Sequence, residues 1–222
     1  MVGTSIRIMN RFIIMLIVAT ALVAGCSRRG IEGDGVIKSE DRPIPEFSKI
    51  TITGGYEIEW VSGKPGLKIS TDQNLLSHIR TVVTGDSLEI DTKESLAPTR
   101  TIIITMSSAY LANVRLTGGI SFKANQVNGQ DLQIEAVGAS QINVAGSVTN
   151  LGVNLTGASK LDAKSLQAQK ATVALTGASD ADVNATDALK VSITGSGSLT
   201  YSGNPKSLEQ SVTGAGNIRR RE

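Results

Sequence analysis

Residues 155–160 read LTGASK, and residues 175–180 repeat them as LTGASD. The same phrase recurs in weaker form along the chain, and six of its glycines follow one another at intervals of 20, 19, 20, 18 and 19 residues: Gly118, Gly138, Gly157, Gly177, Gly195 and Gly214. Gly54 gives a seventh copy, farther away. A repeat of this length with strand-like composition is typical of stacked coils. The sequence therefore predicts a solenoid.

Apolar residues alternate with polar ones on both sides of each repeat glycine. They occupy the positions six, four and two residues before it and four residues after it, as in Leu151, Val153, Leu155 and Leu161 around Gly157. Alternation at period two indicates a strand with one buried face. Each coil is thus predicted as strand, turn, strand. We expect an all-β fold, a parallel, right-handed β-helix with coils about 4.8 Å apart.

The glycines themselves are predicted to form the corners of the coils. A sharp corner often needs a positive φ, which glycine adopts without steric cost. The small residues that follow, such as Ala158 and Ser159, would let successive corners stack closely. A structural turn is the favoured interpretation of the repeated phrase, and a repeated ligand-binding site is the alternative.

The N-terminal half is less regular than the repeats. Strands are predicted near residues 48–53, 56–61, 66–71, 79–84, 86–91 and 101–106. The 64 residues from Gly54 to Gly118 would then make about three irregular coils. Asp72 is predicted to cap a helical turn over residues 73–77. At the other end, Gln210 and Arg220 replace apolar residues, which would blunt the last sheet edge.

The first 25 residues resemble an export signal. Arg7 and Arg11 precede an apolar run over residues 12–23, which ends at Ala24-Gly25-Cys26. This ending resembles a bacterial lipoprotein signal, which implies lipid attachment at Cys26 and a membrane anchor. Cys26 is the only cysteine, and a free or buried thiol is the alternative. Ser27, by the same resemblance, favours the outer membrane, and the leaflet stays open.

We divide the chain into a signal peptide (1–25), a flexible tether (26–46) and one β-helical domain (47–222). Within the domain, residues 47–110 form irregular coils and residues 111–222 form regular repeats. The full chain has 22 basic and 20 acidic side chains. Without Arg7 and Arg11 the basic count becomes 20, so the mature chain is neutral and bulk charge gives no sign of nucleic-acid binding.

Residues that carry catalytic or metal chemistry are sparse. His78 is the only histidine, and we expect it at the surface or half-buried. Without a second histidine or a cysteine pair, neither a transition-metal site nor another cofactor site is predicted. Asp180 and Asp182 follow one corner, but the ladder of acids that a calcium-binding β-roll needs is missing, leaving at most a single calcium site.

Enzymes that degrade polysaccharides on β-helices use clustered acids for general acid–base work. The candidates here, Glu57, Glu59, Glu89 and Asp91, are expected on solvated strand faces, and no catalytic residues are assigned.

From residue 47 to 218 the chain resembles the bacterial head GIN domain family, described as adhesin heads of autotransporters. The resemblance rests on residues 47–50 leading to Gly54, on the strand at 85–90, and on the Thr-Gly ladder from Gly118 to Gly214. It implies an exported β-helical domain and supplies no catalytic residues. The sequence lacks the translocator segment of an autotransporter.

Three functions remain open from the sequence. The first is a non-enzymatic envelope module, adhesin-like or scaffolding, whose polar faces bind a glycan or an envelope protein. The second is a carbohydrate-active enzyme of the lyase or hydrolase kind, and the third is a structural spacer. Fold alone does not choose among them.

Overall fold

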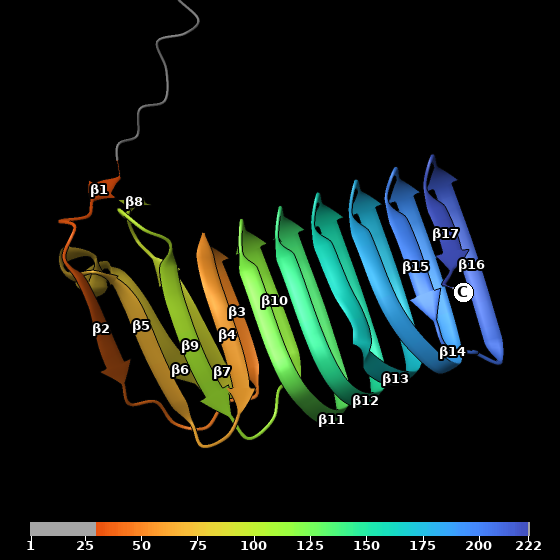
Figure 1. The fold of residues 1–222 in the computed structure, drawn as a ribbon, viewed down its shortest axis with the longest axis horizontal. Helices are drawn as coiled ribbons and strands as arrows, with labels where there is room; N and C mark the ends of the chain where they lie inside the picture. The colour runs from red at the N-terminus through yellow and green to blue at the C-terminus, as the bar shows by residue number, and fades with distance from the viewer. Residues whose placement is uncertain (1–29, 222) are drawn as a thin grey trace, which may run out of the picture.

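The computed structural model describes residues 30–221, and these form a stack of β-coils (Figure 1). Each regular coil has one strand that leads into a glycine corner and one that follows it. Four long strands run from one corner to the next: β11 (Ser121–Gly138), β12 (Gln141–Gly157), β13 (Lys160–Gly177) and β14 (Asp180–Gly195). Shorter strands complete the other coils: β3 (Lys49–Gly54), β4 (Tyr56–Ser62), β10 (Asn113–Gly118), β15 (Ser198–Ser202), β16 (Ser207–Gly214) and β17 (Asn217–Arg220).

Two sheets result, which we call the leading sheet and the trailing sheet. The leading sheet contains the strands that run into corners, which are β3, β10, the second halves of β11 to β14, and β16. The antiparallel pair β6 (Ile79–Thr84) and β7 (Ser87–Thr92) extends this sheet beyond β3. The trailing sheet contains the strands that follow corners, which are β4, the first halves of β11 to β14, β15 and β17. Beyond β4 it is extended by β9 (Ile102–Ser108), β5 (Gly66–Asp72) and β2 (Ile37–Arg42).

The predicted parallel solenoid is confirmed. All seven repeat glycines are aligned in parallel register, in the order Gly54, Gly118, Gly138, Gly157, Gly177, Gly195 and Gly214. The apolar columns fill the space between the sheets: Val153 and Val173 are each 1% exposed, and Leu161 is 1% exposed. Stacking these columns buries a shared core that one coil could not bury by itself.

The last coil is open on its outer side. Every residue of β16 is exposed, including Leu208 and Val212, each at 42%, in columns that are buried in the preceding coils. Gln210 lies between them and is exposed as well, in agreement with the prediction that the last coil is more polar than the others.

Six strands predicted in the N-terminal half are confirmed within two residues, as β3, β4, β5, β6, β7 and β9. The prediction of three coils between Gly54 and Gly118 is wrong, because these two glycines are direct neighbours. After β4 the chain runs outward through β5 and β6, returns as β7 and β9 beside the first coil, and then crosses to β10. Irregular spacing along the sequence hid this detour, since sequence order and stacking order differ here.

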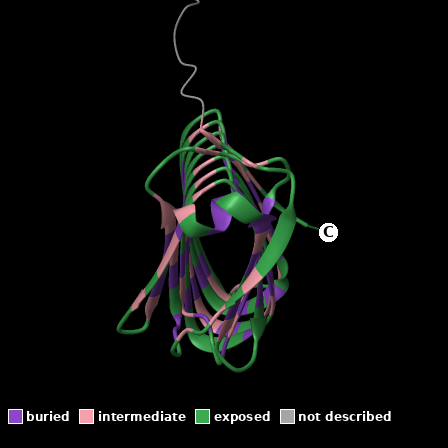
Figure 2. Ribbon diagram, turned by 90° about the vertical axis from the view of Figure 1, so that its left-hand side faces the viewer, coloured by how far each residue is buried: buried purple, intermediate pink, exposed green. Residues whose placement is uncertain are grey.

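The detour builds a cap over the N-terminal end of the core. The 3-10 helix η2 (Gln73–His78) joins β5 to β6 and buries Leu75 and Leu76. Figure 2, which views the solenoid from this end, shows the short helix lying across the opening. The predicted capping role of Asp72 is wrong, because its side chain makes no cap hydrogen bond to η2.

The Asp72 carboxylate instead fastens two other segments to the cap. It accepts hydrogen bonds from the backbone N–H of Gly35 at 2.8 Å, from the N–H of Thr99 at 2.9 Å and from the Thr99 hydroxyl at 2.7 Å. These bonds satisfy a carboxylate whose residue is 0% exposed. The hydroxyl of Thr99 is the main reason that the pKa of Asp72 lies below its usual value; burial opposes this, and the backbone donors add to the lowering.

The segment predicted as a flexible tether contributes strands to the domain. β1 (Ile31–Glu32) pairs with β8 (Leu96–Ala97), and β2 pairs antiparallel with β5. Arg42, the last residue of β2, also binds the segment from η2 to β6: its guanidinium donates hydrogen bonds to the carbonyl oxygens of Leu76 and Ile79 at 2.7 and 2.6 Å. The tether prediction is therefore wrong for residues 31–42. Most side chains of β2 are exposed, so the segment shows no buried alternation by which its sequence could reveal a strand.

Candidate functional site

The repeat glycines form corners with a left-handed backbone. Their φ values run from +95° at Gly177 to +146° at Gly54, a region that favours glycine. A Cβ atom placed on Gly177 would lie 2.6 Å from the carbonyl oxygen of Gly157 in the preceding coil. The glycines therefore allow both the turn and the close approach of neighbouring coils.

A ladder of buried serines runs along the inside of the same corners. Ser140, Ser159 and Ser179 are at most 1% exposed. The Ser159 hydroxyl donates to the carbonyl oxygen of Gly138 at 3.2 Å and accepts from the N–H of Ser140 at 3.2 Å. From the sequence, only the small size of these serines was expected to matter. Their recurrence two residues after the glycine was the signal for an inward, hydrogen-bonded position.

The acids weighed as catalytic candidates lie on outward faces, and three of the four lie beside basic side chains. The Asp91 carboxylate accepts hydrogen bonds from Nε and Nη2 of Arg80, and the distance from Nε to Oδ1 is 2.7 Å. A carboxylate oxygen of Glu89 lies 3.3 Å from Nη2 of the same guanidinium. The hydrogen bonds from Arg80 hold the pKa of Asp91 below its usual value. Glu59 lies 3.9 Å from Lys123, and Glu57 is exposed. Asp91, Glu89 and Glu59 thus each lie within ion-pair distance of a cation.

His78 is half-buried at the end of η2, with Nδ1 3.5 Å from a carboxylate oxygen of Glu94. Within residues 30–221, no three His, Cys, Asp or Glu side chains are grouped so that they could hold a metal ion.

Each of the two aspartates weighed for calcium has one carboxylate oxygen engaged with another group. Asp180 accepts from the Ser198 hydroxyl at 2.7 Å, and Asp182 forms an ion pair with Arg221. Asp162, opposite Asp182 on the neighbouring strand, accepts from the Lys164 ammonium at 2.7 Å. Burial opposes ionisation of Asp162, but Lys164 outweighs it and lowers the pKa of that carboxyl.

A shallow groove crosses three coils on the outer face of the leading sheet. Gly152 lies in register between Gln133 and Thr172, and its missing side chain leaves a hollow that the Gln133 amide partly covers. Asn150, Asn154 and Lys170 complete the polar lining of a hollow of about 400 Å³. Amide and hydroxyl groups dominate this lining, so it can donate and accept hydrogen bonds with little net charge.

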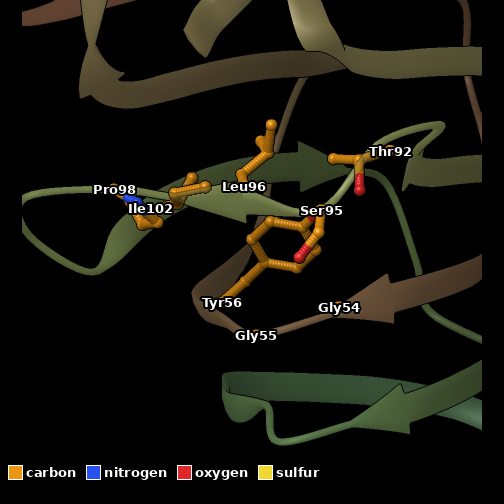
Figure 3. A pocket seen from close by; sticks show the side chains of 8 residues that line it. All are labelled: Gly54, Gly55, Tyr56, Thr92, Ser95, Leu96, Pro98 and Ile102. Carbon is orange, nitrogen blue, oxygen red and sulfur yellow. The ribbon is translucent and has the colours of Figure 1, made fainter. Parts of the chain in front are cut away.

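A second hollow, of about 240 Å³, lies beside the first corner (Figure 3). We call it the first-corner pocket, and it is lined by Gly54, Gly55, Tyr56, Thr92, Ser95, Leu96, Pro98 and Ile102. In Figure 3 the ring of Tyr56 lies between the Gly54–Gly55 turn and the segment that carries Ser95 and Leu96. Burial raises the pKa of the Tyr56 phenol, with a hydrogen bond to Thr92 acting in the opposite direction. The pocket therefore presents neutral polar groups and an apolar wall.

Comparison with protein families confirms the resemblance seen in the sequence. The family described as "Putative auto-transporter adhesin, head GIN domain" matches residues 46–205. The chain belongs to the head GIN domain family. Comparison with curated proteins gives no match.

Solved structures similar to this head GIN domain share its fold. A "putative adhesin" from Bacteroides fragilis superposes with a TM-score of 0.73 at 20% identity, over 86% of this chain and 100% of the other. A "putative adhesin" from Parabacteroides merdae gives a TM-score of 0.56 at 20% identity, and a "putative lipid binding protein" from Parabacteroides distasonis gives 0.53 at 24% identity. Each of these two matches covers 86% of this chain and 99% of the other.

The lipid-attachment prediction falls on Cys26, which lies outside the described residues. Across the part of the chain that the structure does describe, no helix has the length and apolarity needed to cross a bilayer.

Proposed function

We propose that this head GIN domain is a non-enzymatic binding module of the bacterial cell envelope, which presents its outer sheet faces to a glycan or to an envelope protein. The observation that carries the proposal is the polar groove over Gly152. Gln133, Asn154 and Thr172 face outward there from three successive coils, on a sheet whose core positions are fixed by packing. A rigid array of amides and hydroxyls suits a partner rich in hydroxyl groups, and no covalent step is required of it.

We further propose that lipid attached to Cys26 holds the module on the outer membrane. The support is the charged start, the short apolar run and the Ala24-Gly25-Cys26 ending of the signal. The membership in a family of adhesin heads agrees with a location in the envelope. The anchor and the binding face are separate parts of the proposal and are tested separately.

The binding face is tested with full-length protein, purified in detergent, on arrays of neutral and N-acetylated glycans and in crosslinking pull-downs from envelope fractions. Replacing both Asn154 and Thr172 with Ala should weaken binding at least tenfold, because both side chains line the groove. The matched control replaces Asn217 and Thr213, an exposed asparagine and threonine of the last coil, and should bind as the original does. Absence of any glycan or protein partner, or equal loss in both variants, would count against the proposal.

A further inference from the structure

The two ends of the solenoid differ in how the core is covered. The N-terminal end is closed by η2, which lies across the opening (Figure 2). At the C-terminal end, β16 pairs with β14 and β17 pairs with β15, and no described strand lies beyond them. Leu208 and Val212 of β16 are each 42% exposed, whereas their register partners Leu189 and Ile193 in β14 are each 1% exposed. The last coil therefore exposes apolar side chains that one more pair of strands would cover.

The outward charges of the last coil have opposite signs on the two sheets. On the leading sheet, Glu209 of β16 lies in register with Lys190 of β14, and their charged atoms are 2.9 Å apart. On the trailing sheet, Arg219 is an exposed residue of β17, and Arg221, which follows β17, forms an ion pair with Asp182 of β14. Toward the open end, the sign thus changes from positive to negative on the leading sheet and from negative to positive on the trailing sheet.

A second copy of this chain can cover the open face in two ways. Leading and trailing strands run in opposite directions, because the chain reverses at each corner, so both ways pair strands antiparallel about a two-fold axis. In the first way, β16 pairs with β16 and β17 with β17, which places the arginines of both copies on one sheet. In the second way, β16 of each copy pairs with β17 of the other, so that Glu209 faces Arg219 and Arg221. Opposite charges across a strand pair stabilise it and like charges destabilise it, so the charges favour the second way.

The position of β1 favours the same axis. β1 pairs with β8, and Leu96 of β8 lines the pocket beside the Gly54–Gly55 turn, so the chain enters the domain on the side of the glycine corners (Figure 1). Cys26 precedes the start of β1, at Ile31, by five residues, which span at most about 18 Å. In the second way the axis runs parallel to the strands and keeps β1 of both copies on one side. Lipids on both copies of Cys26 can then enter one membrane, whereas the first way turns one copy over.

We propose that two copies of this domain pair through their last coils, β16 of each against β17 of the other, on one membrane surface. The pairing covers Leu208 and Val212 and continues the alternation of charge across the contact. Head-to-tail stacking is disfavoured, because it would place the open face of one copy on the end that η2 closes in the next. The arginines still block pairing of β17 with another β17, in keeping with a blunted edge. The pairing goes beyond the proposed binding function, and only its placement on one membrane rests on the proposed anchor.

Sedimentation velocity of the full-length protein, in a detergent whose density matches the buffer, measures the association. A contact limited to one coil is small, so we expect a reversible dimer with a dissociation constant of roughly 1–100 µM. Val212→Ser should weaken the dimer about tenfold, because it removes an apolar side chain from the contact. Val82→Ser is the matched control: Val82 is 38% exposed, on β6 at the other end, and its replacement should leave the dissociation constant within about twofold.

Charge reversal tests which strands meet. Glu209→Lys should weaken the dimer at least fivefold, and so should the combined change Arg219→Glu and Arg221→Glu, because each places like charges opposite one another. All three changes together restore opposite signs and should give a tighter dimer than either set alone. Urea unfolding of each variant shows whether the coil itself is still folded.

Every result of these measurements supports or overturns the pairing. A monomer at about 100 µM, or equal weakening by Val212→Ser and Val82→Ser, overturns the contact. Open-ended polymers overturn it in favour of head-to-tail stacking. An unchanged dimer in Glu209→Lys, or no recovery in the combined variant, overturns the pairing of β16 with β17. Fatty-acid labelling of Cys26 decides the placement on one membrane separately, and glycan arrays and pull-downs decide the proposed binding function separately.

Discussion

Replacing Gly177 with alanine should destabilise the solenoid far more than the same change at Gly152. At Gly177 the φ of +95° costs a residue with a side chain roughly 1–3 kcal/mol. The new Cβ would also lie 2.6 Å from the Gly157 carbonyl oxygen, so two coils must move apart. That movement weakens the 2.8 Å hydrogen bond from Ala178 to the same oxygen, which contributes about 1 kcal/mol. Stiffening of the unfolded chain offsets up to about 1 kcal/mol, leaving a loss of roughly 1–4 kcal/mol.

Gly152→Ala is the control because the obstacle there is of another kind. Its φ lies outside the left-handed region, and the new Cβ would meet only the end of the exposed Gln133 side chain, which can turn away. We expect a change within about 1 kcal/mol. Urea unfolding followed by circular dichroism measures both variants, and hydrogen exchange shows whether the loss is confined to the coils next to Gly177. Equal stability of the two variants would refute the claim that the corners require glycine.

Three further expectations follow from the described contacts and from the signal sequence. Ser159→Ala should lower the free energy of unfolding, measured in urea, by about 1–3 kcal/mol, because it leaves the buried Ser140 N–H without an acceptor. The control Ser192→Ala, on the exposed face, should lower it by less than about 0.5 kcal/mol. Similar losses in the two variants would show that the serine ladder does not stabilise the fold. Because the pKa of Asp72 is lowered in the folded state, its ionised carboxylate stabilises the fold above the unfolded pKa of about 3.9, and this stabilisation is lost as the pH falls through the folded pKa. Asp72→Asn should therefore be less stable than the original protein at pH 7 and should lose less further stability between pH 5 and pH 3. A pH profile of stability parallel to that of the original protein would contradict the role of this carboxylate. Cys26→Ser should abolish labelling by a radioactive fatty acid and release the protein from membranes; a variant that stays equally membrane-bound would disprove the anchor.

The repeated half of the fold could be predicted because its signals reinforce one another. The interval between glycines gave the coil, the alternation around Val153 and Val173 gave the buried face, and the Thr-Gly-Ala phrase gave the corner. Each of these is local in sequence, and stacking repeats them in register. Local signals are sufficient when neighbouring coils are also neighbours along the chain.

The N-terminal cap could not be predicted because its contacts join distant and irregular segments. Asp72 contacts Gly35 and Thr99, which lie 37 and 27 residues away. β2 exposes most of its side chains, so its pairing with β5 leaves no trace in its hydrophobic pattern. Gly54 is adjacent to Gly118 only because the chain detours and returns, and no spacing along the sequence encodes such a return.

The regular repeat predicts the fold but does not indicate where a binding site lies. The Thr-Gly phrase is similar at all seven corners, so it cannot mark one of them as different. Both hollows arise where the repeat is broken. Gly152 interrupts a column that holds Gln133 before it and Thr172 after it, and the Tyr56 ring stands beside Gly54 where the later corners have a preceding glycine carbonyl. A break in a repeat costs stability when it leaves a core or a backbone group unsatisfied, so it persists more readily where a ligand restores the lost contact. In this head GIN domain, departures from the column pattern are therefore better guides to binding than the repeated phrase itself, and Gly152 is the departure over which the polar groove lies.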